Sequence, residues 1–232
     1  MTFWLLMTLA GFLAGSFPTG YLIAKSRGID IRTVGSGNIG ATNVGRILGP
    51  KAWLLCFAID LAKGLLPTLA AGIAGGTAGR LFMPPIDAWG WLLAMLGPIL
   101  GHMFCPWLGF KGGKGVATGL GSLMGVFPAL TLPAAAAFAV FIAALAAWRY
   151  VSLAAMLAAA SLPFSVWAFF AFCDAQHWFP AGRSDDAAGP TPFIALTALV
   201  AALVILRHRA NIARLLAGSE PRLGVARARR DP

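Results

Sequence analysis

The amino-acid sequence predicts an all-α fold: a polytopic membrane helix bundle of about seven transmembrane helices, in one domain over residues 1–221. Three observations predict this class. Of the 232 residues, 59% are hydrophobic and only 11% are charged, too few charges to cover a soluble domain of this size. The apolar residues come in runs of the length that a helix needs to cross a bilayer, and a helix satisfies its own backbone there. Basic residues gather in alternate loops.

Each apolar run is expected to form one helix. The runs lie near residues 3–24, 52–74, 88–105, 116–130, 134–148, 151–172 and 192–206. The first run has no basic leader and no cleavage site, so we expect it to stay as a span. The fourth and fifth runs are short and are separated by Pro128 and Pro133, so they could instead form a broken pair that does not span fully. A five-helix count would keep the same end-to-end orientation.

The orientation follows from the positive-inside rule. Lysines and arginines crowd the loop after the first run, the loop after the third run, the turn near Arg149 and the C-terminal tail, whereas the alternate loops carry few of them. The N-terminus is therefore expected outside and the C-terminus in the cytoplasm. Residues 222–232 are expected to form a basic cytoplasmic tail that contacts lipid headgroups.

The excess of basic residues narrows the class of partner. Lysine and arginine number 18 against 8 acidic residues, which in a membrane protein favours anionic headgroups or substrates. No aromatic-basic RNA motif is present, so we expect no nucleic-acid partner. The three cysteines have no metal-ligand spacing and are expected to fill space in apolar segments.

Three polar segments fall on the expected cytoplasmic side. They read SGNIGATNVGR at 36–46, GHMFCPWLGFKGGKGVATGLG at 101–121 and RHRANIARLLAGSE at 207–220, and a short RYVSL at 149–153 joins them. Segments far apart in sequence that meet at one membrane face are typical of a site built between helices.

The second segment has the composition of a phosphate cradle. Glycines let successive backbone N–H groups approach an anion, a following helix start adds its positive end, and Lys111 and Lys114 add charge. The register is not that of a nucleotide P-loop. The alternative is that the glycines allow close helix packing while the lysines anchor to headgroups.

The first and third segments offer further polar groups. Arg46 has a guanidinium fork suited to phosphate, and His208 and Asn211 are spaced to share a helix face. Short donors and acceptors in the first segment are Ser36, Asn38, Thr42 and Asn43. Turn chemistry is the alternative for these four, and an interfacial side chain in a basic stretch is the alternative for His208.

In this order and with these spacings, the three segments closely resemble the acyl-phosphate-dependent glycerol-3-phosphate acyltransferases of bacteria. The match covers nearly the whole chain. The resemblance implies a seven-helix protein of the bacterial inner membrane with its site facing the cytoplasm. It implies transfer of a fatty acyl group from acyl phosphate to the 1-hydroxyl of sn-glycerol 3-phosphate, which gives lysophosphatidic acid and phosphate in the first acylation of phospholipid synthesis.

The resemblance also implies roles for particular residues. The catalytic residues would be His208, Lys114, Ser36 and Asn211. Glycerol 3-phosphate would contact Ser36, Arg46, Lys114, Ser152, His208 and Asn211. The donor phosphate would lie on Gly112, Gly113, Lys114 and Gly115, with weaker additions from Lys111, Asn38, Thr42 and Asn43. No cofactor and no metal are expected, and the partners are membrane lipids and, transiently, the enzyme that makes acyl phosphate.

Several mechanisms stay open at this stage. Acyl phosphate is an activated anhydride, so direct attack by the acceptor is favoured over a covalent intermediate on Ser36. His208 could take the hydroxyl proton or only orient the acceptor, and the substrate phosphate could itself act as base. The H-x-x-x-x-D pair of acyl-CoA-dependent and acyl-carrier-protein-dependent acyltransferases is absent. A transporter or channel for phosphate esters and a non-catalytic scaffold are the rival classes. The polar motifs on one face and the lack of an inverted repeat argue against the first, and the second leaves the phosphate motifs unexplained.

Overall fold

The computed structural model describes residues 1–178 and 188–224, which form an all-helical bundle without β-strands in these ranges. This confirms the predicted fold class. The α-helices are α1 Thr2–Gly15, α2 Thr19–Lys25, α3 Ala41–Leu48, α4 Pro50–Ala74, α5 Pro85–Met103, α6 Val116–Gly125, α7 Thr131–Trp148, α8 Val151–Ala175, α9 Thr191–Arg207 and α10 Arg209–Leu216, and a 3-10 turn, η1, covers Pro106–Leu108.

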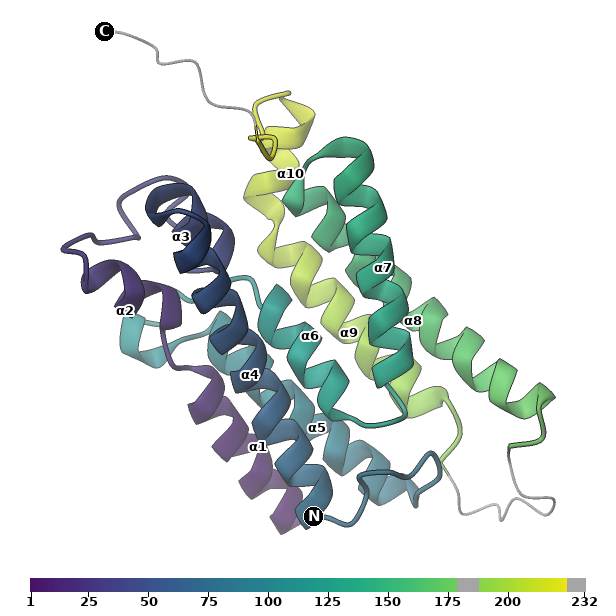
Figure 1. Ribbon diagram of the computed structural model, residues 1–232. Helices are drawn as coiled ribbons and strands as arrows, with labels where there is room; N and C mark the ends of the chain where they lie inside the picture. The colour runs from purple at the N-terminus through teal and green to yellow at the C-terminus, as the bar shows by residue number, and fades with distance from the viewer. Residues whose placement is uncertain (179–187, 225–232) are drawn as a thin grey trace, which may run out of the picture.

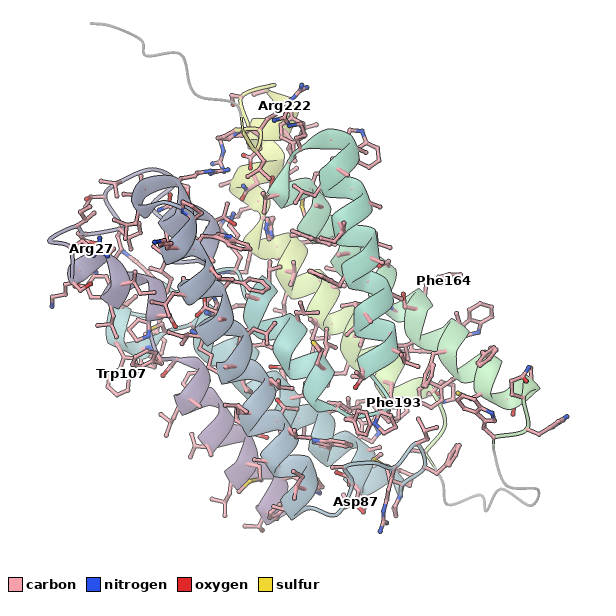
Figure 2. The ribbon with its side chains drawn as sticks, in the orientation of Figure 1. Arg27, Asp87, Trp107, Phe164, Phe193 and Arg222 are labelled. Carbon is pink, nitrogen blue, oxygen red and sulfur yellow. The ribbon has the colours of Figure 1, made fainter. Side chains whose placement is uncertain are left out.

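The bundle is built around α5. Of its membrane-spanning stretch 72% is buried, against 22–33% in the other four long spans, because α1, α4, α6 and α9 pack against α5. The outer helices turn large apolar side chains outward, among them Leu66, which is 61% exposed, and Phe164, which is 67% exposed. An apolar exterior of this kind suits a lipid surrounding. Figure 2 shows Phe164 pointing away from the bundle.

Within residues 1–178 and 188–224, five spans are long and apolar enough to cross a membrane, and the first of them, Thr2–Lys25, contains both α1 and α2. The number is six if α9 and α10, which are bent by 58° at their junction, count as one span. The fourth expected segment, 116–130, is only partly helical. Its helix α6 has 10 residues and ends at Gly125 before the Phe127–Pro128 bond. A helix of that length rises about 15 Å, half of a hydrocarbon core. The suspected break between the fourth and fifth runs therefore lies at Pro128, between α6 and α7, whereas Pro133 lies in the first turn of α7.

Two features of the N-terminal third differ from expectation. The run expected as one helix over 3–24 divides into α1 and α2 at Phe17 and Pro18. Proline has no N–H to donate into the preceding turn, so the helix stops there. The glycine-rich first segment, which reads as a loop, contains the helix α3. This helix buries Asn43 and Val44 and leaves Arg46 at the surface.

The polar segments meet at one end of the bundle. In Figure 1, α2, α3 and α10 lie together at the end opposite the N-terminus. Arg27 and Arg222 are at this end in Figure 2, and Asp87 is at the opposite one. The last described residues pack back on the α7–α8 turn, where Leu223 N–H donates to Arg149 O at 2.7 Å and Arg222 Nε donates to the Tyr150 hydroxyl at 2.9 Å. The rest of the expected tail, 225–232, lies outside the described residues.

Candidate active site at the polar end of the bundle

Lys114 joins the second polar segment to the third. It stands two residues before α6, and its ammonium group donates a hydrogen bond to Asn211 Oδ1 on α10. Both residues were expected in one site although 97 positions separate them. The structure thus brings the glycine-rich loop of the second segment, residues 111–115, and the start of α10 together.

Glu220 is the acceptor around which the third segment is organised. Its Oε1 accepts from Asn211 Nδ2 at 2.6 Å and from Ser152 Oγ at 2.7 Å, and its Oε2 accepts from Arg214 Nε at 2.7 Å. Burial of the carboxyl opposes ionisation, but these three hydrogen bonds outweigh it, and the pKa of Glu220 is lowered. No role was expected for this residue from the sequence. The sequence offers one indication that Glu220 matters: it is the only acidic residue in the basic segment 207–220.

The charges around Lys114 show how concentrated the positive potential is. Burial and the neighbouring cations lower the pKa of Lys114 to about 8, while the negative charge of Glu220 acts to raise it. The cations are Arg214, Arg46 and Arg207. Arg46, from the first segment, therefore lies within electrostatic reach of Lys114, as expected. An anion bound here would relieve the repulsion among these groups.

The glycine-rich loop is held on both sides by hydrogen bonds. The amide of Gly112 donates to Met103 O at 3.2 Å, and the amide of Gly113 donates to His102 O at 3.0 Å. These two amides already donate within the chain. The N–H groups available to an anion are those of the first turn of α6, because the first N–H groups of a helix have no acceptor within the helix. Gly115 caps this helix in the left-handed region, at φ +77°, where glycine is favoured.

Arg207 holds the outer side of the loop. Its guanidinium donates to Gly112 O at 2.9 Å and to Gly113 O at 2.9 and 3.2 Å. It also lies 5.6 Å from the centre of the Phe104 ring. The sequence places Arg207 at the head of the third segment, but its role as a clamp depends on contacts across 94 and 95 residues that spacing does not reveal.

The first segment supplies a structured loop and an exposed serine. Ser36 is exposed, and its amide donates to Asn43 Oδ1 at 2.9 Å. Asn43 Nδ2 in turn donates to the carbonyls of Ile31 and Val34. Asn38 Oδ1 accepts from the Gly40 amide at 2.9 Å, at the start of α3. The two asparagines therefore shape the loop, as the turn alternative expects, and Thr42 is half-buried beside them.

A polar cavity of about 540 Å³ separates the first and second segments. It is lined by Asp30, Arg32, Thr33, Gly37, Phe110, Lys111, Gly112 and Arg207. Arg32 is paired with Asp30 at 2.7 Å, and hydrogen bonds from this arginine lower the pKa of Asp30 to about 2. The cavity thus has more positive than negative groups on its walls. Ser36 precedes Gly37, an uncharged residue of the same lining.

His208 stands at the bend between α9 and α10. It is 2% exposed, and its Nδ1 lies 2.8 Å from Val204 O. Since a carbonyl can only accept, Nδ1 is the protonated nitrogen and Nε2 of the neutral ring keeps its lone pair. The backbone carbonyl of His208 accepts from the Asn211 amide at 2.8 Å, so the two residues are adjacent, as their spacing predicts.

An apolar cavity of about 90 Å³ begins beside the glycine-rich loop. It passes between α6, α7, α8 and α9, and its lining includes Gly115, Val116, Leu120, Phe138, Phe141 and Leu162. Small residues of α8, such as Ala155 and Ala159, form part of its wall. One end of α6 therefore borders both a concentration of positive charge and an apolar space.

The comparisons with known proteins agree with one another. Residues 5–218 match the family described as glycerol-3-phosphate acyltransferase. The chain is 45% identical over 228 residues to the glycerol-3-phosphate acyltransferase of Thermosynechococcus vestitus, with 95% of each chain covered. It is 42% identical over 221 residues to that of Geotalea daltonii, with 95% of this chain and 97% of the relative covered.

Two solved structures of PlsY (YgiH), an integral membrane glycerol 3-phosphate acyltransferase, are also similar. The glycerol 3-phosphate form superposes with a TM-score of 0.76 at 38% identity and covers 95% of this chain and 96% of its own. The lysophosphatidic acid form gives a TM-score of 0.73 at 38% identity, with 95% of each chain covered.

Proposed function

From the premise that this chain belongs to the glycerol-3-phosphate acyltransferase family, we propose that it transfers a fatty acyl group from acyl phosphate to the 1-hydroxyl of sn-glycerol 3-phosphate. The relatives support acylation of glycerol 3-phosphate, and their structures contain the acceptor and the lysophosphatidic acid product. The proposal adds the identity of the donor and the roles of the residues.

One observation carries the choice of donor. Lys114, the start of α6 and the apolar cavity are contiguous, because Gly115 and Val116 both open the helix and line the cavity. An acyl phosphate has its anionic head directly joined to its apolar chain, so it fits a site in which the two environments touch. The phosphate would lie against Lys114 and the first turn of α6, and the chain would enter the cavity.

The acceptor is assigned to the other side of Lys114. Arg46 would bind the phosphate of glycerol 3-phosphate through its fork, and Ser36 would line its path from the polar cavity. Lys111, on the wall of that cavity, adds to the positive potential that attracts the anion. Asn211 would orient Lys114, and Ser152 would hold the Glu220 carboxylate that fixes Asn211.

The reaction then needs only direct attack. The glycerol oxygen forms a bond to the acyl carbonyl carbon as the bond from that carbon to the phosphate oxygen breaks. The electron pair of the broken bond leaves with the phosphate, and the hydroxyl proton is transferred to that phosphate. Nε2 of His208 would accept a hydrogen bond from the attacking hydroxyl and orient it. Lys114 would stabilise the charge that grows on the departing phosphate, an effect felt most in the transition state.

The test is an assay of donor choice with purified protein in detergent. Acyl phosphate, acyl-CoA and acyl carrier protein are offered separately with glycerol 3-phosphate, and Lys114→Ala serves as the inactive control. We expect product from acyl phosphate alone. Turnover with acyl-CoA that matches the acyl phosphate rate and disappears in Lys114→Ala would show that the donor is wrong while the site is right.

We also propose that the site faces the cytoplasm of the inner membrane, with the N-terminus outside. The support is the gathering of basic residues at the end of the bundle that holds α3 and α10. A reporter fused after Pro232 should be cytoplasmic, and one inserted into the 174–190 loop should be external. Finding both reporters on one side would refute the orientation.

A further inference from the structure

A cluster of three ionisable side chains is buried beneath the glycine-rich loop and has no role in the function proposed above. Asp60 and Lys63 are one turn apart on α4, with Lys63 Nζ 2.8 Å from Asp60 Oδ1. His102, in the last turn of α5, places its Nδ1 3.8 Å from the same oxygen. None of the three side chains is more than 6% exposed. Ionisable groups inside membrane helices are costly and commonly mark function.

The cluster is tied to the break between α1 and α2. Lys63 Nζ donates to Phe17 O at 2.7 Å, at the break between α1 and α2, where this carbonyl also accepts from the Thr19 amide at 3.0 Å. Lys63 therefore neutralises Asp60 and holds the end of α1 with one ammonium group. This fixes α4 against α1 at the level where the glycine-rich loop crosses the bundle.

His102 is the member of the cluster that touches the loop. Its backbone carbonyl accepts the hydrogen bond of the Gly113 amide at 3.0 Å. A Cβ added at Gly113 would lie 2.0 Å from His102 Nε2 and 2.9 Å from two carbons of the same ring. Residue 113 therefore rests directly on the imidazole, and Lys114 follows it in the chain.

The neighbouring glycine is blocked by a different group. A Cβ added at Gly112 would lie 2.0 Å from the backbone oxygen of His102 and 2.8 Å from the backbone of Met103. Removal of the His102 side chain would create space at position 113 and none at position 112. The two glycines thus form a matched pair for a test of the ring.

We propose that His102 is a positioning residue for acyl transfer: its ring, held above the Asp60–Lys63 ion pair, sets the height of the glycine-rich loop and so the place of Lys114. The inference rests on the proposed function, because the height of the loop matters only if Lys114 and the start of α6 bind the donor phosphate. Misplacement of a binding group by about 1 Å can cost 100-fold in rate.

The test is a double-mutant cycle on purified protein, with kcat and KM measured for acyl phosphate. Gly113→Ala pushes the loop off the ring and should lower kcat/KM about 100-fold, and His102→Ala removes the support and should lower it about tenfold. In the double variant the added methyl enters the vacated space, so we expect a loss near tenfold and not the thousandfold product. His102→Ala should raise KM for the donor. A purely structural defect would only reduce the amount of folded enzyme and would leave this KM unchanged.

Gly112→Ala is the matched control. Its methyl meets the main chain, so we expect His102→Ala to give it no rescue, and the two losses should multiply. If Gly113→Ala alone does not fold, a single size-exclusion peak and recovered turnover in the double variant would support the same relation, and failure of the double variant to fold would overturn it.

The outcomes separate this inference from the proposed function. Multiplied losses in the Gly113→Ala and His102→Ala double variant, with both single variants impaired, would overturn the role of His102 and leave the donor site in place. Full activity of Gly113→Ala would instead show that the loop is not the donor site, and both would fall.

Discussion

Two acid-centred clusters lie at the polar end of this bundle, and they are built in opposite ways. Glu220 accepts three hydrogen bonds, and its partner Arg214 is 36% exposed. Asp60 pairs with Lys63 where both are almost fully buried, and neither Asp60 Oδ1 nor His102 Nδ1 has a hydrogen bond within the described residues. The first cluster orders side chains that would meet substrate, and the second orders the backbone beneath them.

We therefore expect substitutions in the two clusters to affect different properties, activity at Glu220 and stability at Asp60 and Lys63. Glu220 holds three donor side chains in place. A change in its acceptor geometry would let those donors turn to other partners, so we expect a loss of activity there. A buried ion pair loses stability when one partner is removed, because the other charge remains uncompensated in the interior. The four predictions that follow test this contrast.

The largest expected effect is on stability at the buried cluster. Lys63→Met keeps the length of the side chain but leaves Asp60 unpaired, which should cost about 3–5 kcal/mol. The variant with both Asp60→Asn and Lys63→Met should regain most of that loss, because no charge remains. Thermal unfolding in detergent measures both, and equal destabilisation of the single and double variants would show that the ion pair is not what matters.

The next effect is on activity at Glu220. Glu220→Gln keeps the shape of the side chain but replaces one acceptor oxygen by an amide NH2 group, a donor that faces other donors. We expect kcat/KM to fall about 100-fold, with a smaller change in unfolding temperature than Lys63→Met gives. Steady-state kinetics measure the loss. Arg214→Gln is the control, since it removes only the half-exposed partner and should have a weaker effect.

A smaller loss is expected where the loop is clamped from outside. Arg207→Lys keeps the charge but cannot reach both Gly112 O and Gly113 O with one planar fork, so KM for acyl phosphate should rise about tenfold. The acceptor KM should change less. An unchanged donor KM would show that the loop is fixed from beneath, by His102 alone.

The smallest effect is a shift in pH dependence that arises at Lys114, which is linked to Glu220 through Asn211. The pKa of Lys114 is about 8 in the folded protein, so the ammonium is lost as pH rises through 8, and kcat/KM should fall there. The bound phosphates favour the charged form, so the fall in kcat should come at higher pH. Because the unfolded chain binds this proton up to its ordinary pKa, stability should rise with pH above about 8. Lys114→Met should remove that rise, and its persistence in the variant would assign it to another group.

The sequence predicted the fold class and most long helices because apolar runs of membrane length leave few alternatives. It also predicted that Lys114, Asn211 and Ser152 belong to one site. The structure links these three side chains by hydrogen bonds through Glu220, and their shared role in a site stays a prediction. It missed α3, because glycines and asparagines read as loop while the buried Asn43 and Val44 that hold the helix are visible only in three dimensions.

Glu220 and the Asp60–Lys63 pair were missed for different reasons. The bond from Ser152 to Glu220 spans 68 residues, a distance at which spacing carries no information. Asp60 and Lys63 are three residues apart inside an otherwise apolar run, and that pattern could have been recognised, since a charge within a membrane helix needs a nearby partner.

The tight seating of the glycine-rich loop has a consequence for inhibitors. Positions 112 and 113 have no room for a Cβ, and position 115 has a backbone angle that disfavours one. A compound that recognises the main chain of this loop would therefore contact atoms that no point mutation can replace. Resistance would have to arise through substitutions farther away. Most of those would lower the activity of the enzyme as much as its affinity for the compound.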